Sequence, residues 1–241
     1  MKQFNFLVSA FFASTVLSFL PACNSGDDKK PEEETPVTTT EKTPEVTTPK
    51  LNQVLFIEHK VADYAKWKTV YDSHDSIRRA HGLSNYIIGR GMDDPNMVLI
   101  ILKMDDATKA KELSASPDLK DRMQKAGVTG KPNFTYLQVV MNDDSQIEQT
   151  ARVMMSHKVK DWDAWKNEFD SHKQARMDAG LIDRGVGYSV DDNHDVNIVF
   201  AITDMQKAKA FMSSKDLKDK MTAAGVEGPP KSFFYNIVEK Y

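Results

Sequence analysis

The feature that most constrains this chain is an internal repeat. Shifting the sequence by 98 residues aligns positions 54–140 with 152–238 without a gap, and 33 of the 87 aligned pairs are identical. The stretch HKVADYAKWKTVYDSH at 59–74, for example, returns as HKVKDWDAWKNEFDSH at 157–172. Such self-similarity indicates that one structural unit has been duplicated, so we expect the two copies to fold alike.

Each copy shows the same order of predicted elements. Asp63 can cap a helix that keeps its aromatic residues at spacings of three and four, and Gly82 ends that helix. Short runs rich in β-branched and aromatic residues predict strands, and the segment MDDPN predicts a turn between two of them. In the first copy we expect strands at 54–60, 83–90, 97–104 and 133–140, with a second helical region over 106–125 that is broken near Pro117.

The element order predicts the fold class. Strand, helix, strand, strand, helix, strand is the order of a ferredoxin-like unit, whose helices cover one face of an antiparallel sheet. The strand at 97–104 is apolar on both faces, so both faces should be buried. Since the helices cover only one face, we expect an α+β protein in which the repeats 51–142 and 151–241 pack sheet against sheet.

Three motifs recur in both copies and carry a resemblance to a known family. They are V-x-D-[YW]-x-x-W-K, a helix that runs through D-S-H to H-G-L or A-G-L, and S-x-D-L-K-D-x-M-x-x-A-G-V. In these motifs each copy resembles the dimeric α/β-barrel superfamily, which includes antibiotic-biosynthesis monooxygenase-like domains. Two chains of that superfamily usually join to form the barrel, so the resemblance implies a monomer that closes one barrel by itself. It also implies cofactor-independent oxygenation or haem chemistry as activities to consider.

The first 23 residues read as a targeting segment. Lys2 precedes a mostly apolar run over 4–19, and Leu-Pro-Ala-Cys follows at 20–23. This pattern resembles a bacterial lipoprotein signal, which implies removal of residues 1–22 and acylation of Cys23, the only cysteine. Each buried methylene of an acyl chain adds about 0.8 kcal/mol, so several chains anchor a protein stably to a membrane. An ordinary secretory signal, or a membrane span with an incidental cysteine, is the alternative.

Residues 24–50 are rich in Pro, Thr and Glu and show no apolar periodicity. Such a segment cannot bury enough surface to fold, so residues 23–50 are predicted to be a disordered tether that carries the lipid. We therefore expect a lipid-anchored protein of the bacterial cell envelope, at the outer membrane, on either its periplasmic or its surface face.

Composition and missing motifs exclude several classes of function. The net charge of the whole chain is −3, which provides no field for nucleic acid. Once Cys23 is acylated, no cysteine remains for a disulfide, a thiol nucleophile or a zinc site. The sequence also lacks a phosphate-binding loop, HExxH, GxSxG and CxxC, and we expect no metal site and no resident cofactor other than a possible haem.

Four repeated histidines are the candidate catalytic residues. His59 and His157 end the first strand of each copy, where imidazoles at a cavity mouth could move protons or bind a metal or haem iron. A hydrogen bond to a neighbouring loop is the simpler explanation. His74 and His172 lie on the helix that follows, one turn before Arg78 and Arg176, and we keep them as candidates as well.

The repeated helix also offers candidate ligand-binding residues. Arg78 and Arg176 follow His74 and His172 by four positions, so each pair could clamp an anion. These side chains could equally pack at the helix margin with their polar ends in water. The remaining candidates, which could line an aromatic pocket or simply belong to the core, are Trp67 and Trp165.

Three functions stay open at this point. The leading hypothesis is that the barrel binds a small apolar or aromatic ligand without turnover. The alternatives are a monooxygenase-like or haem-handling enzyme that uses the four histidines, and a surface interaction module on a stalk. An open barrel interior favours the first, whereas an interior filled with side chains favours the last.

Overall fold

The computed structural model describes residues 51–241. The predicted signal segment, Cys23 and the tether lie outside these residues. The first repeat consists of β1 (Gln53–Val61), α1 (Tyr64–Ser73), α2 (Asp75–Ala80), β2 (Leu83–Gly91), β3 (Met97–Met104), α3 (Ala107–Ala115), α4 (Pro117–Lys125) and β4 (Val128–Asn142). The second consists of β5 (Ala151–Val159), α5 (Trp162–Ser171), α6 (Lys173–Asp178), β6 (Leu181–Ser189), β7 (Asp195–Ile202), α7 (Met205–Met212), α8 (Lys215–Ala223) and β8 (Val226–Lys240).

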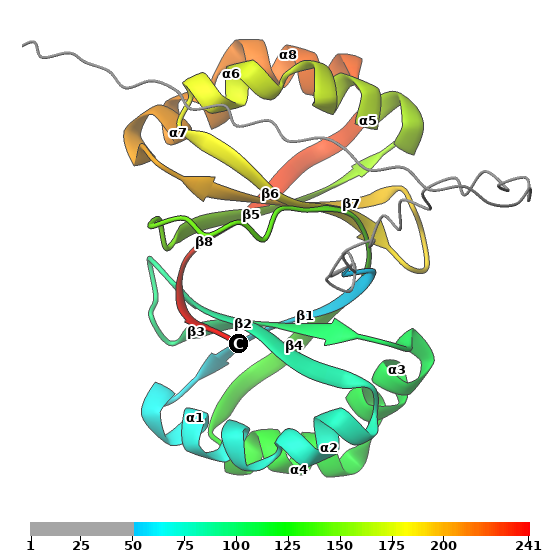
Figure 1. Ribbon diagram of the computed structural model, residues 1–241, viewed down its shortest axis with the longest axis vertical. Coiled ribbons are helices and arrows are strands. Elements are labelled where there is room, and N and C mark those ends of the chain that lie inside the picture. The colour runs from blue at the N-terminus through cyan, green and yellow to red at the C-terminus, as the bar shows by residue number, and fades with distance from the viewer. Residues whose placement is uncertain (1–50) are drawn as a thin grey trace, which may run out of the picture. The chain divides into compact units, whose positions relative to one another are not determined.

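The eight strands close into one antiparallel barrel. Their order is β1-β3-β2-β8-β5-β7-β6-β4, so each repeat contributes four neighbouring strands. The repeats meet at two seams, β2 with β8 and β4 with β6. Figure 1 shows the two sheets facing each other, with helices α1–α4 outside one and α5–α8 outside the other. The predicted α+β fold, two ferredoxin-like units paired sheet to sheet within one chain, is confirmed.

The residues predicted to start and end the first helix do so, but the helix itself differs from the prediction. The Asp63 carboxylate accepts a hydrogen bond from the Lys66 amide at 2.7 Å and caps α1, and Gly82 has a left-handed φ of 69°. The predicted single helix between them is broken at His74, however, because α1 ends at Ser73 and α2 begins at Asp75. No helix between residues 51 and 241 combines the length and the apolar character that a bilayer crossing needs.

Apolar side chains form three layers. Along β1, Leu55 and Ile57 face the helices, whereas Val54 and Phe56 face the opposite sheet. The same alternation buries every residue of β3 from Val98 to Leu102, as predicted for a strand that is apolar on both faces. The middle layer, between the two sheets, therefore exists only because both repeats are present.

Glycine lies at both seams between the repeats. A Cβ on Gly89 of β2 would overlap the ring of Tyr235 in β8, and one on Gly187 of β6 would overlap the carbonyl oxygen of Gln138 in β4. Gly89 and Gly187 are equivalent positions of the two copies. The missing side chains let the strands of different repeats approach closely enough to close the barrel.

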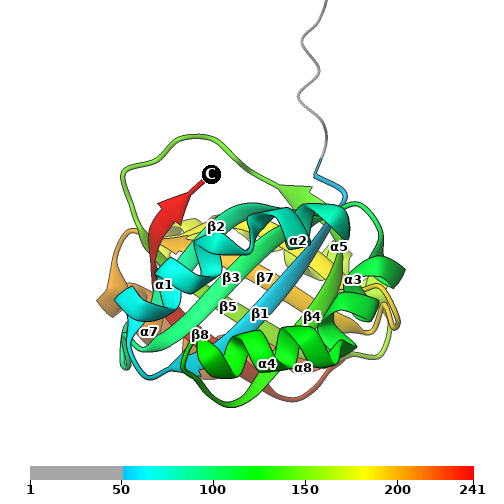
Figure 2. The ribbon, with the colours of Figure 1, turned by 90° about the horizontal axis from the view of Figure 1, so that it is seen from below.

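The connection from β4 to β5, residues 143–150, runs past one end of the barrel. Figure 2 shows this connection arching beside the C-terminal end of β8. The strand β4, which ends the first repeat, lies at the seam with β6, and β8, the last strand, lies at the seam with β2. The connection that follows β4 and the C-terminus that follows β8 both lie at this end of the barrel.

We expect Gly187→Ala to destabilise the protein by about 2 kcal/mol, because the added methyl group forces β6 away from the backbone of β4. Gly185→Ala is the matched control, since a Cβ there makes only ordinary contacts 3.8 Å from Val199, and we expect a change below about 1 kcal/mol. Urea unfolding of the 51–241 fragment measures both changes. Equal effects of the two substitutions would contradict the role of Gly187 in seam closure.

Candidate functional site

A cavity of about 190 Å³ lies between the two sheets at the end of the barrel that the 143–150 connection crosses. The apolar wall comes from the first repeat and includes Val54, Phe56, Ile101 and Leu137. The wall from the second repeat is mixed and combines the apolar Val186, Val199 and Ile237 with the polar Arg152, Arg184 and Asn197.

The two walls are equivalent positions of the duplicated unit that have diverged. Shifting the sequence by 98 residues places Val54 on Arg152 and Leu99 on Asn197. All four of these side chains are buried. The first copy shows that apolar residues satisfy the fold at these positions, so the polar residues of the second copy need another explanation.

Polar contacts fasten the 143–150 connection across the cavity. Arg184, itself buried, donates to the Asp143 carboxylate at 3.0 Å and to the Ser145 carbonyl oxygen at 2.6 Å. From the other seam, Lys240 pairs with Asp144 at 2.6 Å, and the Tyr86 hydroxyl donates to Asp144 at 3.0 Å. Burial acts to raise the pKa of Asp144, but the hydrogen bonds from Lys240 and Tyr86 lower it below its ordinary value. The connection is therefore held by residues of both repeats.

Arg152 is a second buried cation of this cavity, and unlike Arg184 it has no paired carboxylate among the described residues. Its side chain has an exposed fraction of 5%, and its Nη1 donates to the carbonyl oxygens of Gln149 at 2.6 Å and Ala151 at 2.9 Å. Within residues 51–241 no carboxylate lies at ion-pair distance from it. Burial lowers the pKa of Arg152, yet a guanidinium stays protonated at neutral pH. Arg152 in β5 lies opposite Tyr235 in the neighbouring strand β8. Burial raises the pKa of the Tyr235 hydroxyl group.

The structure brings the predicted site residues together in two places, neither of which is the cavity between the two sheets. Each set lines a small cavity between the helices and the sheet of its own repeat, outside the barrel interior. The first cavity, of about 80 Å³, is lined by His59, Trp67, His74 and Arg78. The second, of about 90 Å³, is lined by His157, Trp165, His172 and Arg176.

His59 and His157 point into these helix–sheet layers. Their rings meet Trp67 and Trp165 edge to face, with ring centroids 5.6 and 5.5 Å apart. Neither ring nitrogen of either histidine has a hydrogen-bond partner among the described residues, so the expected bond to a loop is absent there. Burial lowers the pKa of both imidazoles to about 4, which keeps them neutral at pH 7.

Arg78 and Arg176 are held by the protein itself. Their guanidinium groups lie over the rings of Tyr71 and Phe169, at 3.8 and 3.6 Å from the ring centroids. Each also donates to the backbone carbonyl of that same aromatic residue, in the last turn of α1 or α5. This bond satisfies a carbonyl at the helix end and accounts for the break that the sequence pattern did not predict.

His74 and His172 do not pair with these arginines in the way the spacing predicts. His74 Nε2 lies 2.9 Å from Nη1 of Arg122 in α4, and His172 Nδ1 lies 2.8 Å from the carbonyl oxygen of Glu168. Arg176 instead forms two hydrogen bonds with Asp183, at 2.8 and 2.7 Å. The i,i+4 clamp is absent because both arginines turn inward to the preceding helix.

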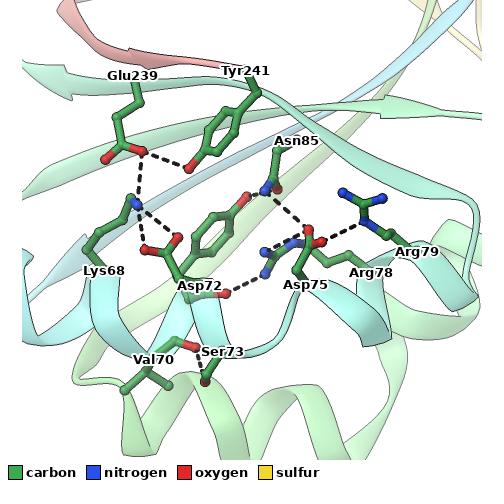
Figure 3. A network of polar contacts seen from close by, with 11 residues as sticks. Lys68, Val70, Asp72, Ser73, Asp75, Arg78, Arg79, Asn85, Glu239 and Tyr241 are labelled. Carbon is green, nitrogen blue, oxygen red and sulfur yellow. Dashed lines mark hydrogen bonds and ion pairs between the residues drawn. The ribbon is translucent and has the colours of Figure 1, made fainter.

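A polar network joins the C-terminus to the first repeat. Figure 3 shows Lys68 of α1 between Asp72 and Glu239, with Nζ to oxygen distances of 2.6 and 2.9 Å. The Tyr241 hydroxyl donates to Glu239 at 2.8 Å. Sequence comparison misses this network because the last residues fall outside the aligned repeat.

Arg152 and Arg184 were missed for a different reason. Identities between the copies do not mark them, because Arg152 and Arg184 stand where the first copy has Val54 and Tyr86. A charged residue facing an apolar one at an inward position of a strand is the signal that could have found them.

Comparison with known proteins supports the fold. No family model and no curated protein matches the sequence. Among solved structures, a proposed monooxygenase from Fusobacterium nucleatum matches with a TM-score of 0.52 and 14% identity, over 79% of this chain and 94% of the other. An anthrone oxidase-like protein matches with a TM-score of 0.52 and 14% identity, over 80% and 94%. This chain has the dimeric α/β-barrel fold. Identity at this level establishes nothing about the activity of the barrel.

A haem-binding protein from Thermus thermophilus is also similar to this dimeric α/β barrel, with a TM-score of 0.47 and 9% identity over 78% of this chain and 92% of the other. Within residues 51–241, no three His, Cys, Asp or Glu side chains gather closely enough to hold a metal ion.

Acid should destabilise the barrel through His59 and His157. Between pH 6.5 and about 4 the unfolded chain binds protons on these histidines while the folded protein does not, so stability falls as the pH falls through this window. At pH 5 the loss relative to pH 7.5 should be about 2 kcal/mol for each histidine. Urea unfolding at both pH values should show this loss in the wild type and its absence in His59→Leu/His157→Leu.

His194→Leu is the control for this acid effect, because the side chain of His194 is half exposed. It should lose stability with acid as the wild type does. The same loss in the double variant as in the wild type would show that the two buried imidazoles are not the cause.

Proposed function

We propose that the protein binds a small, largely apolar or aromatic ligand in the cavity at the end of the barrel. The observation that carries this proposal is a space of about 190 Å³ with an apolar wall, at the place where the two sheets meet. An apolar cavity of roughly 150 Å³ accepts a benzene molecule. The proposed occupant is therefore about the size of one aromatic ring, and the 143–150 connection covers it.

The open interior argues against a simple interaction module. Such a module would fill its barrel with side chains and expose an apolar patch. Among the described residues, the large apolar side chains that are exposed are few and lie on β4, α6, β8 and the C-terminus. They are Val140, Met177, Val238 and Tyr241.

A monooxygenase-like enzyme is the second candidate. Its support is the pair of neutral imidazoles, His59 and His157, which lie beside tryptophans and small cavities without hydrogen-bond partners among residues 51–241. Haem does not fit these places, because cavities of about 80 and 90 Å³ are smaller than one that accepts a single benzene ring. We therefore assign haem no role at His59 and His157.

Filling the barrel cavity should weaken ligand binding. Val199 of β7 lines the cavity, so Val199→Phe should occupy the space of a ligand and weaken binding by about tenfold or more. The exposed Val238 takes the same substitution as a matched control, and Val238→Phe should bind as the wild type does. Fluorine NMR with para-fluorotoluene, para-fluorobenzamide and para-fluorobenzoate measures the dissociation constants.

At least one of these three probes should bind to the wild type, and its mass should be unchanged after incubation in air. A new product mass would favour the enzyme over the binding protein. Absence of binding by all three would reject the proposal. If Val199→Phe fails to fold, Ile237→Phe in β8, at the seam with β2, provides a second way to fill the cavity.

We further propose that acylated Cys23 holds the barrel at a bacterial membrane. When the full chain is expressed in a bacterial host, the wild type should partition into detergent and take up labelled palmitate. Cys23→Ser should do neither, because the thiol that accepts the lipid is gone. Detergent partitioning and label uptake by the variant equal to those of the wild type would contradict the anchor.

A further inference from the structure

The charges around the barrel cavity do not cancel. Five charged residues line it, and four of them form pairs: Arg184 with Asp143 at 3.0 Å, and Lys240 with Asp144 at 2.6 Å. The fifth, Arg152, has no such partner among residues 51–241. The cavity therefore carries a net charge of about +1, located on one buried side chain.

The fold does not require this cation. Val54 occupies the equivalent position of the first repeat, in the equivalent strand, and is buried to the same degree, with exposed fractions of 4% and 5% for Val54 and Arg152. A buried cation without a counter-charge is unfavourable compared with an apolar side chain. The retention of arginine in one copy therefore points to a partner that enters the cavity from outside.

The orientation of Arg152 suits an anion. Two backbone carbonyls, of Gln149 and Ala151, hold its Nη1. Its Nε and Nη2 donate to no residue within 51–241, and the arginine lines the cavity. A guanidinium presents paired N–H groups that match the two oxygens of a carboxylate. The side chain of Asn197, also in the cavity wall, adds an amide.

The apolar wall restricts the rest of the ligand. Val54, Phe56 and Ile101 lie in the part of the cavity that the first repeat supplies, and they can pack only against an apolar body. A single unpaired cation suits one negative charge. A free phosphate or a polyanion would leave charge unmatched and the apolar wall empty.

We infer that the ligand is a monoanionic carboxylate on one aromatic ring or a short apolar chain, with its carboxylate bound by Arg152. This inference rests on the proposed function and names the class of ligand. The first repeat supplies most of the apolar packing surface and the second supplies the unpaired charge, so the site needs both copies of the duplicated unit.

The test compares two probes of the same shape that differ in charge, para-fluorobenzoate and para-fluorobenzamide. The wild-type protein should bind the carboxylate at least about tenfold more tightly than the amide, as a charge-assisted bidentate contact does. Arg152→Met should remove this preference by weakening carboxylate binding about tenfold, with amide binding changed by less than about threefold. Arg152→Lys, which keeps the charge, should retain part of the preference.

Two further measurements separate binding from structure. Arg79→Met removes an exposed arginine that pairs with Asp75 in α2, and it should leave the preference unchanged. The thermal midpoint of ligand-free Arg152→Met should equal or exceed that of the wild type, because an unpaired buried charge has been removed. A clearly lower midpoint in Arg152→Met and Arg152→Lys alike would show that Arg152 is structural and would overturn the inference.

Failure of the inference differs from failure of the proposed function. If the wild type binds carboxylate and amide equally, or if Arg152→Met keeps the preference, the charge assignment is wrong while the cavity remains a binding site. If neither probe nor para-fluorotoluene binds, the proposed function itself fails and the inference fails with it.

Discussion

Both faces of each four-stranded sheet carry buried apolar side chains, and the helices of a repeat can cover only one face. This constraint underlies the rest of the structure. Leu99 and Ile101 of β3 face away from the helices of their own repeat and are fully or almost fully buried, because the second sheet covers them. A lone repeat would expose this face to water, which is strongly unfavourable for contiguous apolar surface. Pairing of the copies is therefore a condition of folding for each.

Joining the two sheets creates the barrel interior, and duplication makes its two halves independent in sequence. In a barrel built from two identical chains, a charged residue at one inward position appears twice and faces its own copy. In this chain Arg152 stands where the other half has Val54, so charge and apolar surface can face each other across one cavity. A tandem repeat can thus build an asymmetric site that a symmetric dimer cannot build from the same positions.

Closure of the barrel also decides which side chains are used for packing within a repeat and which remain available in the barrel interior. The residues that are identical in both copies serve packing inside the helix–sheet layers. Arg78 and Arg176 hold helix ends, and Trp67 and Trp165 pack against buried histidines. These features recur in both copies because both copies need the same layer. Arg152, Arg184 and Asn197 differ from their equivalents in the first copy, and they line the cavity in the barrel interior, where the two halves meet.

The sequence by itself determined the duplication, the order of the elements, the caps at Asp63 and Gly82, and the need for a second sheet. These properties depend on local periodicity and on composition, which a single strand or helix already displays. The sequence also named residues that come together around two small cavities, because helical spacing places them on one face. It did not show that these cavities lie outside the barrel, or that the arginines turn back to the preceding helix.

Only the tertiary structure decided which charges remain unpaired. Arg184 meets Asp143 from 41 positions away, and Lys240 meets Asp144 from 96 positions away. Contacts at such separations depend on strand register and on closure of the seams, and no local pattern encodes them. Arg152 stands out only once these pairs are known, because they show that the carboxylates lining the cavity are already paired with other cations.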